Sequence, residues 1–436
     1  MQTIYIETYG CSNNIAESEI IGGILQRAGF EITKNIELAD IVILNTCGVK
    51  ETTIKKNLYR IEEILKKYKD KKIIVSGCLP EIDYNSIKKI NPEISIVSTN
   101  HITKILESIS RILKGETVEY LGHKKEIKIS QPRIFFSKVT RIIPICSGCN
   151  SFCYFCATKL AKGNVFSYPK EKIINEIKSY KQAGIKEFYI TGQDVSCYGM
   201  DKYETSKLPE LLNDIIKEVK GKYFIRVGMM NLKNLIKISN KLLKVYRSEN
   251  IYKFLHLPIQ SGSNIILKKM NREYTKEEFL DFCEKFRRHL KEINIWTDVI
   301  IGYPGETEKD FLETIEVIKI LKPDKVNISK FSLHKGTPSY YMKQVDSKIK
   351  SERSKILYKI VREISKERNN IWLNWEGEIL INNITKKGLV GRNYAYKPVI
   401  IENVDNKKAK EIFGNFVKVK IVGFEGGFLK GELLNN

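Results

Sequence analysis

Four of the nine cysteines in this 436-residue chain lie within eleven positions, in the segment CSGCNSFCYFC (146–156). Cys149, Cys153 and Cys156 follow the spacing C-x3-C-x2-C, and Cys146 lies three residues further upstream. Two different triples of thiols are therefore possible within this one segment. Short spacings between thiols are typical of zinc or iron–sulfur sites. We therefore predict a metal site here rather than a set of disulfides.

Three further cysteines are far apart in the sequence, yet each comes directly after a predicted strand. Cys11, Cys47 and Cys78 end the triplets YGC, NTC and SGC. The β-rich runs that precede them are 4–9, 39–46 and 72–77. Because parallel strands of one sheet end at the same edge, where ligands bind in such folds, we expect the three thiols to gather there.

Neither triple offers the four protein ligands of a structural zinc site. The chain has five histidines, and none lies near 149–156. Three thiols that hold a cubane iron–sulfur cluster leave one iron with an open position, which is useful where something else must bind. The remaining cysteines, Cys146, Cys197 and Cys283, are predicted to be small buried hydrophobic residues.

The segment that must position Cys11, Cys47 and Cys78 alternates strands and helices over residues 1–125. Two of its strands are continuous apolar runs, as in buried parallel sheets. The helix predicted over 51–69 has one apolar face, made by Ile54, Leu58, Ile61 and Leu65. This pattern predicts an α/β fold with a doubly wound, flavodoxin-like N-terminal domain.

The alternation continues over residues 138–345 and indicates a central partial (β/α)6 TIM-like barrel. Its six strand candidates are 138–145, 187–192, 223–228, 252–260, 293–302 and 325–331. Amphipathic helices separate them, and Thr307 and Asp310 predict a capping box at the start of one helix. In a barrel of this kind, functional residues lie at the carboxyl ends of the strands.

The last two segments differ from the rest. Residues 348–372 predict a connecting basic helix, with eight Lys or Arg and three Glu, whose charges need only be solvated. Residues 373–436 predict a small all-β barrel of short strands and glycines, without helices. Small basic barrels often bind nucleic acid.

The charge of the whole chain favours a polyanionic partner. Lys and Arg number 74 against 51 Asp and Glu, a formal net charge of +23, which favours RNA or DNA through phosphate neutralisation. No apolar run approaches the ~18 residues of a membrane span. The N-terminus has neither a basic flank nor an apolar core of a signal peptide. We therefore expect a cytoplasmic protein without a membrane partner.

Several signatures along the chain resemble those of the radical S-adenosylmethionine (SAM) methylthiotransferases, over essentially the whole length. They are LNTCGVK, SGCLP, CSGCNSFCYFC, TGQDVSCYG, LHLPIQSGSN, TDVIIGYPGETEKDF and NISKFS. In this family the C-terminal barrel is a TRAM domain. The resemblance implies two [4Fe–4S] clusters, each held by three cysteines.

The resemblance also implies a role for each cluster. Cys149, Cys153 and Cys156 would hold the cluster whose open iron binds SAM and cleaves it reductively to a 5′-deoxyadenosyl radical. Cys11, Cys47 and Cys78 would hold an auxiliary cluster that carries the sulfur to be inserted, and a second SAM would methylate that sulfur. The chemistry then belongs to the cofactors, so no catalytic side chain is predicted.

Contacts to SAM are expected at the ends of the barrel strands, although each of these residues could equally have a structural role. The candidates are Gln193, Asp194, Arg226, Gln260, Ser261, Asp298, Gly302 and Gly305.

The charge of +23 and the TRAM-like barrel favour an RNA substrate. IRVGMMN (225–231) and VNISKFS (326–332) resemble the archaeal and eukaryotic branch of the family. That branch converts N6-threonylcarbamoyladenosine at position 37 of tRNA, next to the anticodon, to its 2-methylthio derivative. It inserts sulfur at C2 of adenine and methylates it.

Other hypotheses for the function stay open at this point. The protein could be a methylthiotransferase of isopentenyladenosine in tRNA or of a ribosomal protein, a cobalamin-carrying enzyme, or a non-catalytic iron–sulfur protein that binds RNA. The chain has no D-x-H-x-x-G loop, which argues against cobalamin. An electron donor and a sulfur source are needed but not identified by the sequence, and a monomer is expected.

Overall fold

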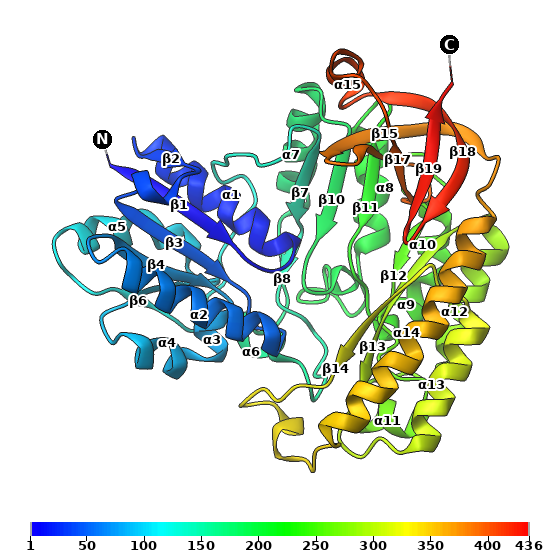
Figure 1. Ribbon diagram of the computed structural model, residues 1–436, viewed down its shortest axis with the longest axis horizontal. Coiled ribbons are helices and arrows are strands. Elements are labelled where there is room, and N and C mark those ends of the chain that lie inside the picture. The colour runs from blue at the N-terminus through cyan, green and yellow to red at the C-terminus, as the bar shows by residue number, and fades with distance from the viewer. Residues whose placement is uncertain (1, 435–436) are drawn as a thin grey trace.

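The computed structural model describes residues 2–434, and its amino-terminal part is a parallel six-stranded sheet with helices on both faces (Figure 1). The strand order is β2-β1-β3-β4-β5-β6, which is the flavodoxin-like order with one added strand. The bounds are β1 Thr3–Thr8, β2 Glu31–Thr33, β3 Ile41–Thr46, β4 Lys72–Gly77, β5 Ser95–Ser98 and β6 Glu119–Tyr120. The predicted doubly wound domain is confirmed.

Two separate apolar cores lie on the two faces of this sheet. Helices α1 (Ser12–Arg27) and α5 (Ile105–Leu113) cover one face, and α2 (Glu51–Lys67) and α4 (Tyr84–Ile90) cover the other. Every residue of β3 is buried, as expected for a strand covered on both sides. The short α3 (Leu79–Ile82) follows β4 directly. Strands β2, β5 and β6 were not predicted.

The central part is a half-barrel of six parallel strands. Its two three-stranded sheets, β7-β10-β11 and β12-β13-β14, are joined by a parallel bridge between Ile225 and Ile251. The bounds are β7 Thr140–Pro144, β10 Glu187–Thr191, β11 Phe224–Val227, β12 Phe254–His256, β13 Asn294–Ile301 and β14 Lys325–Lys330. All six predicted strands are present, and the TIM-like partial barrel is confirmed.

Helices pack on the outside of the half-barrel. They are α7 Lys170–Gln182, α8 Leu208–Glu218, α9 Leu232–Leu235, α10 Ser239–Tyr246, α11 Asn264–Lys269, α12 Lys276–His289, α13 Glu308–Leu321 and α14 Ser347–Asn370. Thr307 and Asp310 form the predicted capping box of α13. The basic helix α14 is confirmed, but it is not solvated all round, because Leu357 and Ile364 are buried in the central core.

The carboxyl-terminal part is a closed five-stranded barrel in the order β15-β16-β17-β19-β18. The bounds are β15 Glu376–Thr385, β16 Gly388–Arg392, β17 Pro398–Ile401, β18 Phe416–Glu425 and β19 Phe428–Leu433. The small all-β barrel is confirmed, whereas its predicted lack of helices is wrong. Helix α15 (Asn406–Ile412) follows β17 and is capped by the side chain of Asp405, a local signal that the strand pattern concealed.

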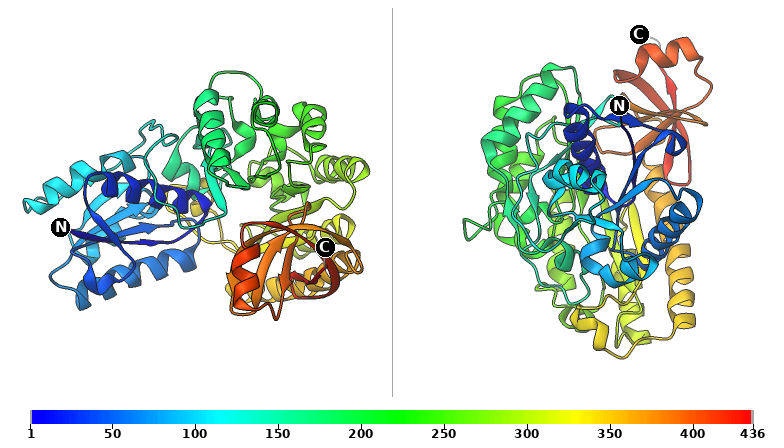
Figure 2. Two further views of the ribbon diagram at one scale, coloured as in Figure 1. Left: turned by 90° about the horizontal axis from the view of Figure 1, so that it is seen from above. Right: turned by 90° about the vertical axis from the view of Figure 1, so that its left-hand side faces the viewer.

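This barrel packs against the amino ends of the central strands. Lys186 Nζ donates to Gly414 O over 3.0 Å, Lys253 N donates to Tyr394 O over 2.8 Å, and Lys222 pairs with Glu378. Figure 2 shows the barrel and the N-terminal sheet apart from each other on the central half-barrel. The carboxyl ends of the central strands are therefore clear of the barrel. None of the helices in residues 2–434 is long and apolar enough to cross a membrane.

Candidate metal centres

The structure brings Cys11, Cys47 and Cys78 together, as their positions after β1, β3 and β4 led us to expect, since these strands are neighbours in the sheet. Cys78 N donates to Thr46 O over 2.8 Å. A Cβ added to Gly10 would lie 2.8 Å from Cys47 Cβ. We call these three residues the strand-end set.

Left-handed glycines shape the turns that carry two of these thiols. Gly10 (φ +113°) precedes Cys11, and Gly77 (φ +91°) precedes Cys78. A Cβ on Gly77 would lie 2.2 Å from Thr46 O, so only glycine fits this turn. Cys11 is exposed, whereas Cys47 and Cys78 are buried, so the set opens to solvent at Cys11.

Burial determines the protonation of the two inner thiols. It raises the pKa of Cys78 to about 12 and also raises the pKa of Cys47. Without a ligand these groups are therefore thiols at neutral pH. Metal binding would displace their protons, and the affinity for metal would then increase with pH.

Cys149, Cys153 and Cys156 occupy the loop between β8 (Cys146–Ser147) and α6 (Ala157–Lys162), and we call them the loop set. Strand β8 pairs with β9 (Phe166–Ser167). Cys156 N donates to Cys153 O over 3.1 Å. Burial, with a smaller contribution from the Cys153 thiol, raises the pKa of Cys156 to about 11.

The start of the loop is fixed by close backbone contacts. Gly148 has φ +76°, and a Cβ there would lie 2.1 Å from Asn164 O. Cys149 N donates to Gly163 O over 3.2 Å, and Lys159 Nζ donates to Cys149 O over 2.5 Å. As in the strand-end set, a glycine that cannot be replaced without strain precedes a cysteine.

The spacing of the thiols distinguishes between metals. Zn–S bonds of about 2.3 Å place the sulfurs of a mononuclear site roughly 3.8 Å apart. Within the described residues, neither set has its three sulfurs within 4.8 Å of one another; the group that does meet this limit is Cys149, Asp194 and Cys197. Two sets of three more widely separated thiols fit a multi-iron cluster better than a single zinc ion.

The compact group around Asp194 is satisfied without a cation. The carboxylate accepts hydrogen bonds from Ser196 N (3.0 Å), Asn231 N (3.1 Å) and Asn234 Nδ2 (3.1 Å). Cys197 Sγ donates to Asp194 O over 2.9 Å.

The three cysteines outside the two sets, Cys146, Cys197 and Cys283, are all buried, as predicted.

One charged neighbour of the loop set was not predicted. Arg272 Nη1 donates to Cys153 Sγ over 3.2 Å, and Arg272 Nη2 donates to Pro258 O over 3.1 Å. A guanidinium in this position places a positive charge beside the loop set, which suits an anionic cluster. Arg272 follows α11 as a single arginine outside any recognised motif, so the sequence carries no signal for it.

Two of the predicted SAM contacts lie beside the loop set. Gln193 Oε1 accepts a hydrogen bond from Gly148 N over 2.7 Å. Asp194 Oδ2 lies 3.8 Å from Cys149 Sγ. Both residues follow β10, so the strand end and the cysteine loop form one site.

Asp298 and Arg226 come from two other strands of the half-barrel. Asp298 contacts His256 Nε2 at 3.2 Å and accepts a hydrogen bond from Asn327 Nδ2 over 2.6 Å. Burial raises the pKa of Asp298, but His256 and Asn327 outweigh this effect and hold it below its usual value. The Arg226 guanidinium lies over three aromatic rings, those of Tyr189, Phe254 and Tyr396, at 5.0 to 5.4 Å from their centroids.

The other predicted contacts have local partners. Gln260 adopts φ +73°, and its N–H donates to Asp298 O over 2.9 Å. Ser261 Oγ lies 3.4 Å from Thr314 Oγ1 on α13. Gly302 N donates to Glu306 Oε2 over 2.8 Å, and Gly305 O accepts from Lys269 Nζ over 3.2 Å. These contacts shape the strand ends.

Comparison with known families and structures gives matches over most of the chain. Residues 143–318 match the Radical SAM superfamily, and residues 3–99 match the Uncharacterized protein family UPF0004. Among solved structures, the radical S-adenosylmethionine methyltransferase TsrM from Kitasatospora setae, with cobalamin and a [4Fe-4S] cluster bound, has a TM-score of 0.58 at 14% identity. This similarity covers 78% of this chain and 74% of that chain, and it shows the fold alone.

Curated relatives match over the full length. A probable threonylcarbamoyladenosine tRNA methylthiotransferase of Methanocaldococcus jannaschii is 39% identical over 99% of this chain and 97% of the relative. Another from Pyrococcus horikoshii is 37% identical over 100% of both chains. The threonylcarbamoyladenosine tRNA methylthiotransferase of Homo sapiens is 30% identical over 99% of this chain and 74% of its own length.

Proposed function

This chain belongs to the family of threonylcarbamoyladenosine tRNA methylthiotransferases, and on that premise we propose that it converts N6-threonylcarbamoyladenosine in tRNA to its 2-methylthio derivative. The observation that carries this proposal is the similarity to archaeal relatives over 97–100% of their length. The reaction inserts sulfur at C2 of the adenine and methylates that sulfur. The cofactors are two [4Fe–4S] clusters and SAM.

We propose that the loop set, Cys149, Cys153 and Cys156, holds the cluster that binds SAM, and that the strand-end set, Cys11, Cys47 and Cys78, holds the auxiliary cluster. When bound, these cofactors supply the radical that removes a hydrogen atom, the sulfur and the methyl group. The protein would bind the clusters through these thiols, of which Cys47 and Cys78 are buried away from water.

The polar groups at the strand ends support the same proposal. Gln193 contacts the cysteine loop at Gly148 and Asp194 lies beside Cys149, which supports a role for both near SAM. Asp298, held by His256 and Asn327, and Arg226 offer polar groups to SAM or to the substrate. Gln260, Ser261 and Gly302 shape the backbone around them.

We further propose a division of labour along the chain. Residues 1–125 hold the auxiliary cluster, and residues 138–345 form the radical SAM core. Residues 348–372 form the helix that connects this core to residues 373–436, a TRAM-like barrel that binds RNA. The last assignment is supported by a hollow of about 470 Å³ on the barrel. Its lining includes Lys386 and Phe428, side chains suited to phosphates and bases, together with Lys387 and Lys430, which pair with Glu425.

The proposal also covers the location of the protein, its oligomeric state and its co-reactants. We propose that it acts on tRNA in the cytoplasm as a monomer. The reaction consumes electrons and sulfur, so an electron donor and a sulfur source must come from elsewhere.

Mass spectrometry of tRNA nucleosides tests this function. The host makes N6-threonylcarbamoyladenosine, lacks its methylthio form, and expresses this chain. We expect 2-methylthio-N6-threonylcarbamoyladenosine to accumulate, and to disappear with Cys47→Ala or Cys153→Ala. The isopentenyl analogue would instead assign the chain to the other tRNA branch. No new nucleoside, in a host shown to load both clusters, would contradict a tRNA substrate.

A further inference from the structure

Helix α6 links the two sets of cysteines. It begins directly after Cys156 of the loop set and ends at Lys162. It packs against α3, which begins directly after Cys78 of the strand-end set. The end of α6 is tied down where Asn100 Nδ2 donates to Ala161 O over 2.9 Å. The last residue of a helix that starts at one set therefore lies next to the other.

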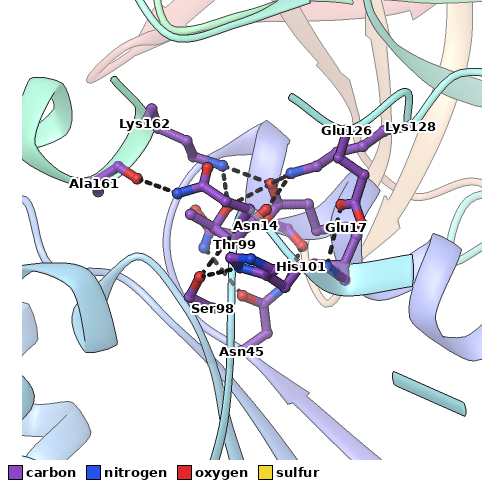
Figure 3. Close-up of polar contacts among 12 residues, drawn as sticks. Asn14, Glu17, Asn45, Ser98, Thr99, His101, Glu126, Lys128, Ala161 and Lys162 are labelled. Atoms are coloured by element: carbon purple, nitrogen blue, oxygen red, sulfur yellow. Dashed lines mark hydrogen bonds and ion pairs between the residues drawn. The ribbon is translucent and has the colours of Figure 1, made fainter. Parts of the chain in front are cut away.

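Lys162 belongs to a buried polar network between the N-terminal sheet and the half-barrel. Its Nζ lies 2.6 Å from Glu17 Oε1 on α1, and Lys128 Nζ lies 2.6 Å from the same oxygen. Thr99 Oγ1 donates to this oxygen over 2.7 Å and accepts a hydrogen bond from Lys162. Figure 3 shows the two lysines reaching Glu17 from different sides. All three charged side chains are at most 4% exposed.

Both partners of Lys162 are tied to the backbone that carries the strand-end set. Thr99 N donates to Gly77 O over 2.9 Å, and Gly77 directly precedes Cys78. Glu17 lies one helical turn after Asn14 on α1.

Asn14 contacts two further parts of the strand-end set. Asn14 Oδ1 accepts from Cys11 Sγ over 3.3 Å, and Asn14 Nδ2 donates to Thr46 O, the carbonyl before Cys47, over 3.2 Å. Lys162 is therefore linked to the turn of Cys78 through Thr99, and to the turns of Cys11 and Cys47 through helix α1, which carries both Glu17 and Asn14.

The two lysines differ in their second neighbours. The charged form of Lys128 is favoured by Glu17 and by Glu126, whose carboxylate accepts hydrogen bonds from Ile102 N and Thr103 N. The charged form of Lys162 is favoured by Glu17 and by the thiols of Cys78 and Cys11. Its hydrogen bond to Thr99, whose N–H donates to Gly77 O, connects Lys162 to the turn directly before Cys78.

The ionisation of these groups agrees with this arrangement. Burial lowers the pKa of Lys162, but Glu17 and Cys78 together raise it above its usual value. For Lys128, burial wins and the pKa lies below its usual value. Conversely, Lys162 is the largest influence that opposes burial at Cys78, where burial raises the thiol pKa.

We propose that Lys162 is a positioning residue that places a fixed positive charge beside the strand-end set and so stabilises the more negative, reduced state of the cluster bound there. Net charge near a cluster is one of the factors that set its reduction potential. A buried ammonium acts strongly because the low dielectric of the interior screens it little. The inference rests on the assignment of Cys11, Cys47 and Cys78 as ligands under the proposed function.

A redox titration of the full-length protein, with both clusters reconstituted and followed by electron paramagnetic resonance, tests this role. The strand-end signal is the one lost in Cys78→Ala, and the loop signal is the one that changes on addition of SAM. Lys162→Met should shift the redox equilibrium of the strand-end cluster about tenfold towards its oxidised form. This corresponds to a reduction potential lower by ~59 mV for one electron. Lys162→Arg keeps the positive charge and should therefore keep most of the original reduction potential.

Lys128→Met is the matched control, because it removes an equally buried ammonium from the same carboxylate oxygen. We expect it to shift the strand-end potential by less than half as much. Iron binding that is lost in Lys162→Met but kept in Lys128→Met would also support the proposal. Equal shifts or equal iron loss in the two variants, or no shift in a fully loaded Lys162→Met, would overturn it. If the strand-end signal survives in Cys78→Ala, the ligand assignment itself is wrong, whatever Lys162 does.

Discussion

The strand-end set and the loop set, which we propose as the ligands of two metal clusters, each bring three thiols together in a different way. The loop set comes from eight consecutive positions, 149–156, so chain connectivity alone keeps its thiols close. The strand-end set comes from three separate turns, which only the pairing of β1, β3 and β4 brings together. One site is local and the other depends on the whole sheet.

The two sets also share features that their origins do not require. In each, a left-handed glycine with no room for a Cβ precedes a cysteine, Gly77 in one and Gly148 in the other. Each also has one nearby cation from a distant part of the chain. Arg272 donates to Cys153, and Lys162 lies in the network around Cys78. The comparison teaches that the two sets differ in how their thiols come together, within one loop or across a sheet. A rigid glycine turn and a nearby positive charge are common to both sets.

The largest effect should come from removing one thiol of each set. Cys78→Ala and Cys156→Ala should each lose roughly half of the bound iron, since under the proposed assignment each set holds one cluster. Each should lower methylthio product by at least ~10²-fold, because losing a ligand exceeds losing an outer-shell partner. Cys78→Ala should still cleave SAM to 5′-deoxyadenosine, and Cys156→Ala should not. Iron analysis and chromatography of both products measure this, and the same cleavage in both variants would contradict the two roles.

Replacing the two glycines should break each set separately. Gly77→Ala and Gly148→Ala force a Cβ to within 2.2 and 2.1 Å of backbone atoms, in addition to about 1–2 kcal/mol for the left-handed conformation. We expect Gly77→Ala to deplete the strand-end cluster and Gly148→Ala to deplete the loop cluster, as judged by their spectroscopic signals.

Gly29→Ala is the control for these glycines. Gly29 has φ +90°, but a Cβ there meets nothing within 4 Å. It should lower the free energy of unfolding by about 1 kcal/mol and leave both clusters in place. Cluster loss in Gly29→Ala would mean that backbone strain, and not the local clash, explains the other two variants.

A smaller effect should follow from removing the cation at the loop set. Arg272→Gln loses the hydrogen bond to Cys153 Sγ and should slow SAM cleavage about tenfold, as loss of an outer-shell partner typically does. Arg272→Lys keeps the positive charge and should slow SAM cleavage by a smaller factor. The potential of the strand-end cluster should not change in either variant. A change there would show that the two sites are electrostatically coupled.

The smallest effect should come from the C-terminal barrel, far from both sets. Asp405 Oδ1 caps α15 by accepting hydrogen bonds from Lys407 N and Lys408 N. Asp405→Ala should lower the free energy of unfolding by about 1 kcal/mol, whereas Asp405→Asn should cost less. Denaturant unfolding measures this. Iron content should be unchanged, and its loss would contradict the independence of the barrel from the cluster sites.

Most of the fold could be predicted because its signals are local. Continuous apolar runs such as 41–44 predict strands buried on both faces, and the spacing of Ile54, Leu58 and Ile61 predicts one face of α2. Strands β2, β5 and β6 have two to four residues, too few to show a period of two. Helix α15 was missed for a similar reason, since a short segment between strands in which five of seven residues are polar resembles a loop.

The sequence by itself determined which cysteines can act together. The spacing 149-153-156 is set by chain connectivity, and the position of a cysteine after a strand is set by local pattern. Only the tertiary structure decided which charges reach these thiols. Arg272 and Cys153 are 119 residues apart, and Lys162 and Glu17 are 145 residues apart. Such contacts depend on how whole sheets and helices pack, because a single lysine or arginine in the sequence has no periodicity that reveals its distant partner.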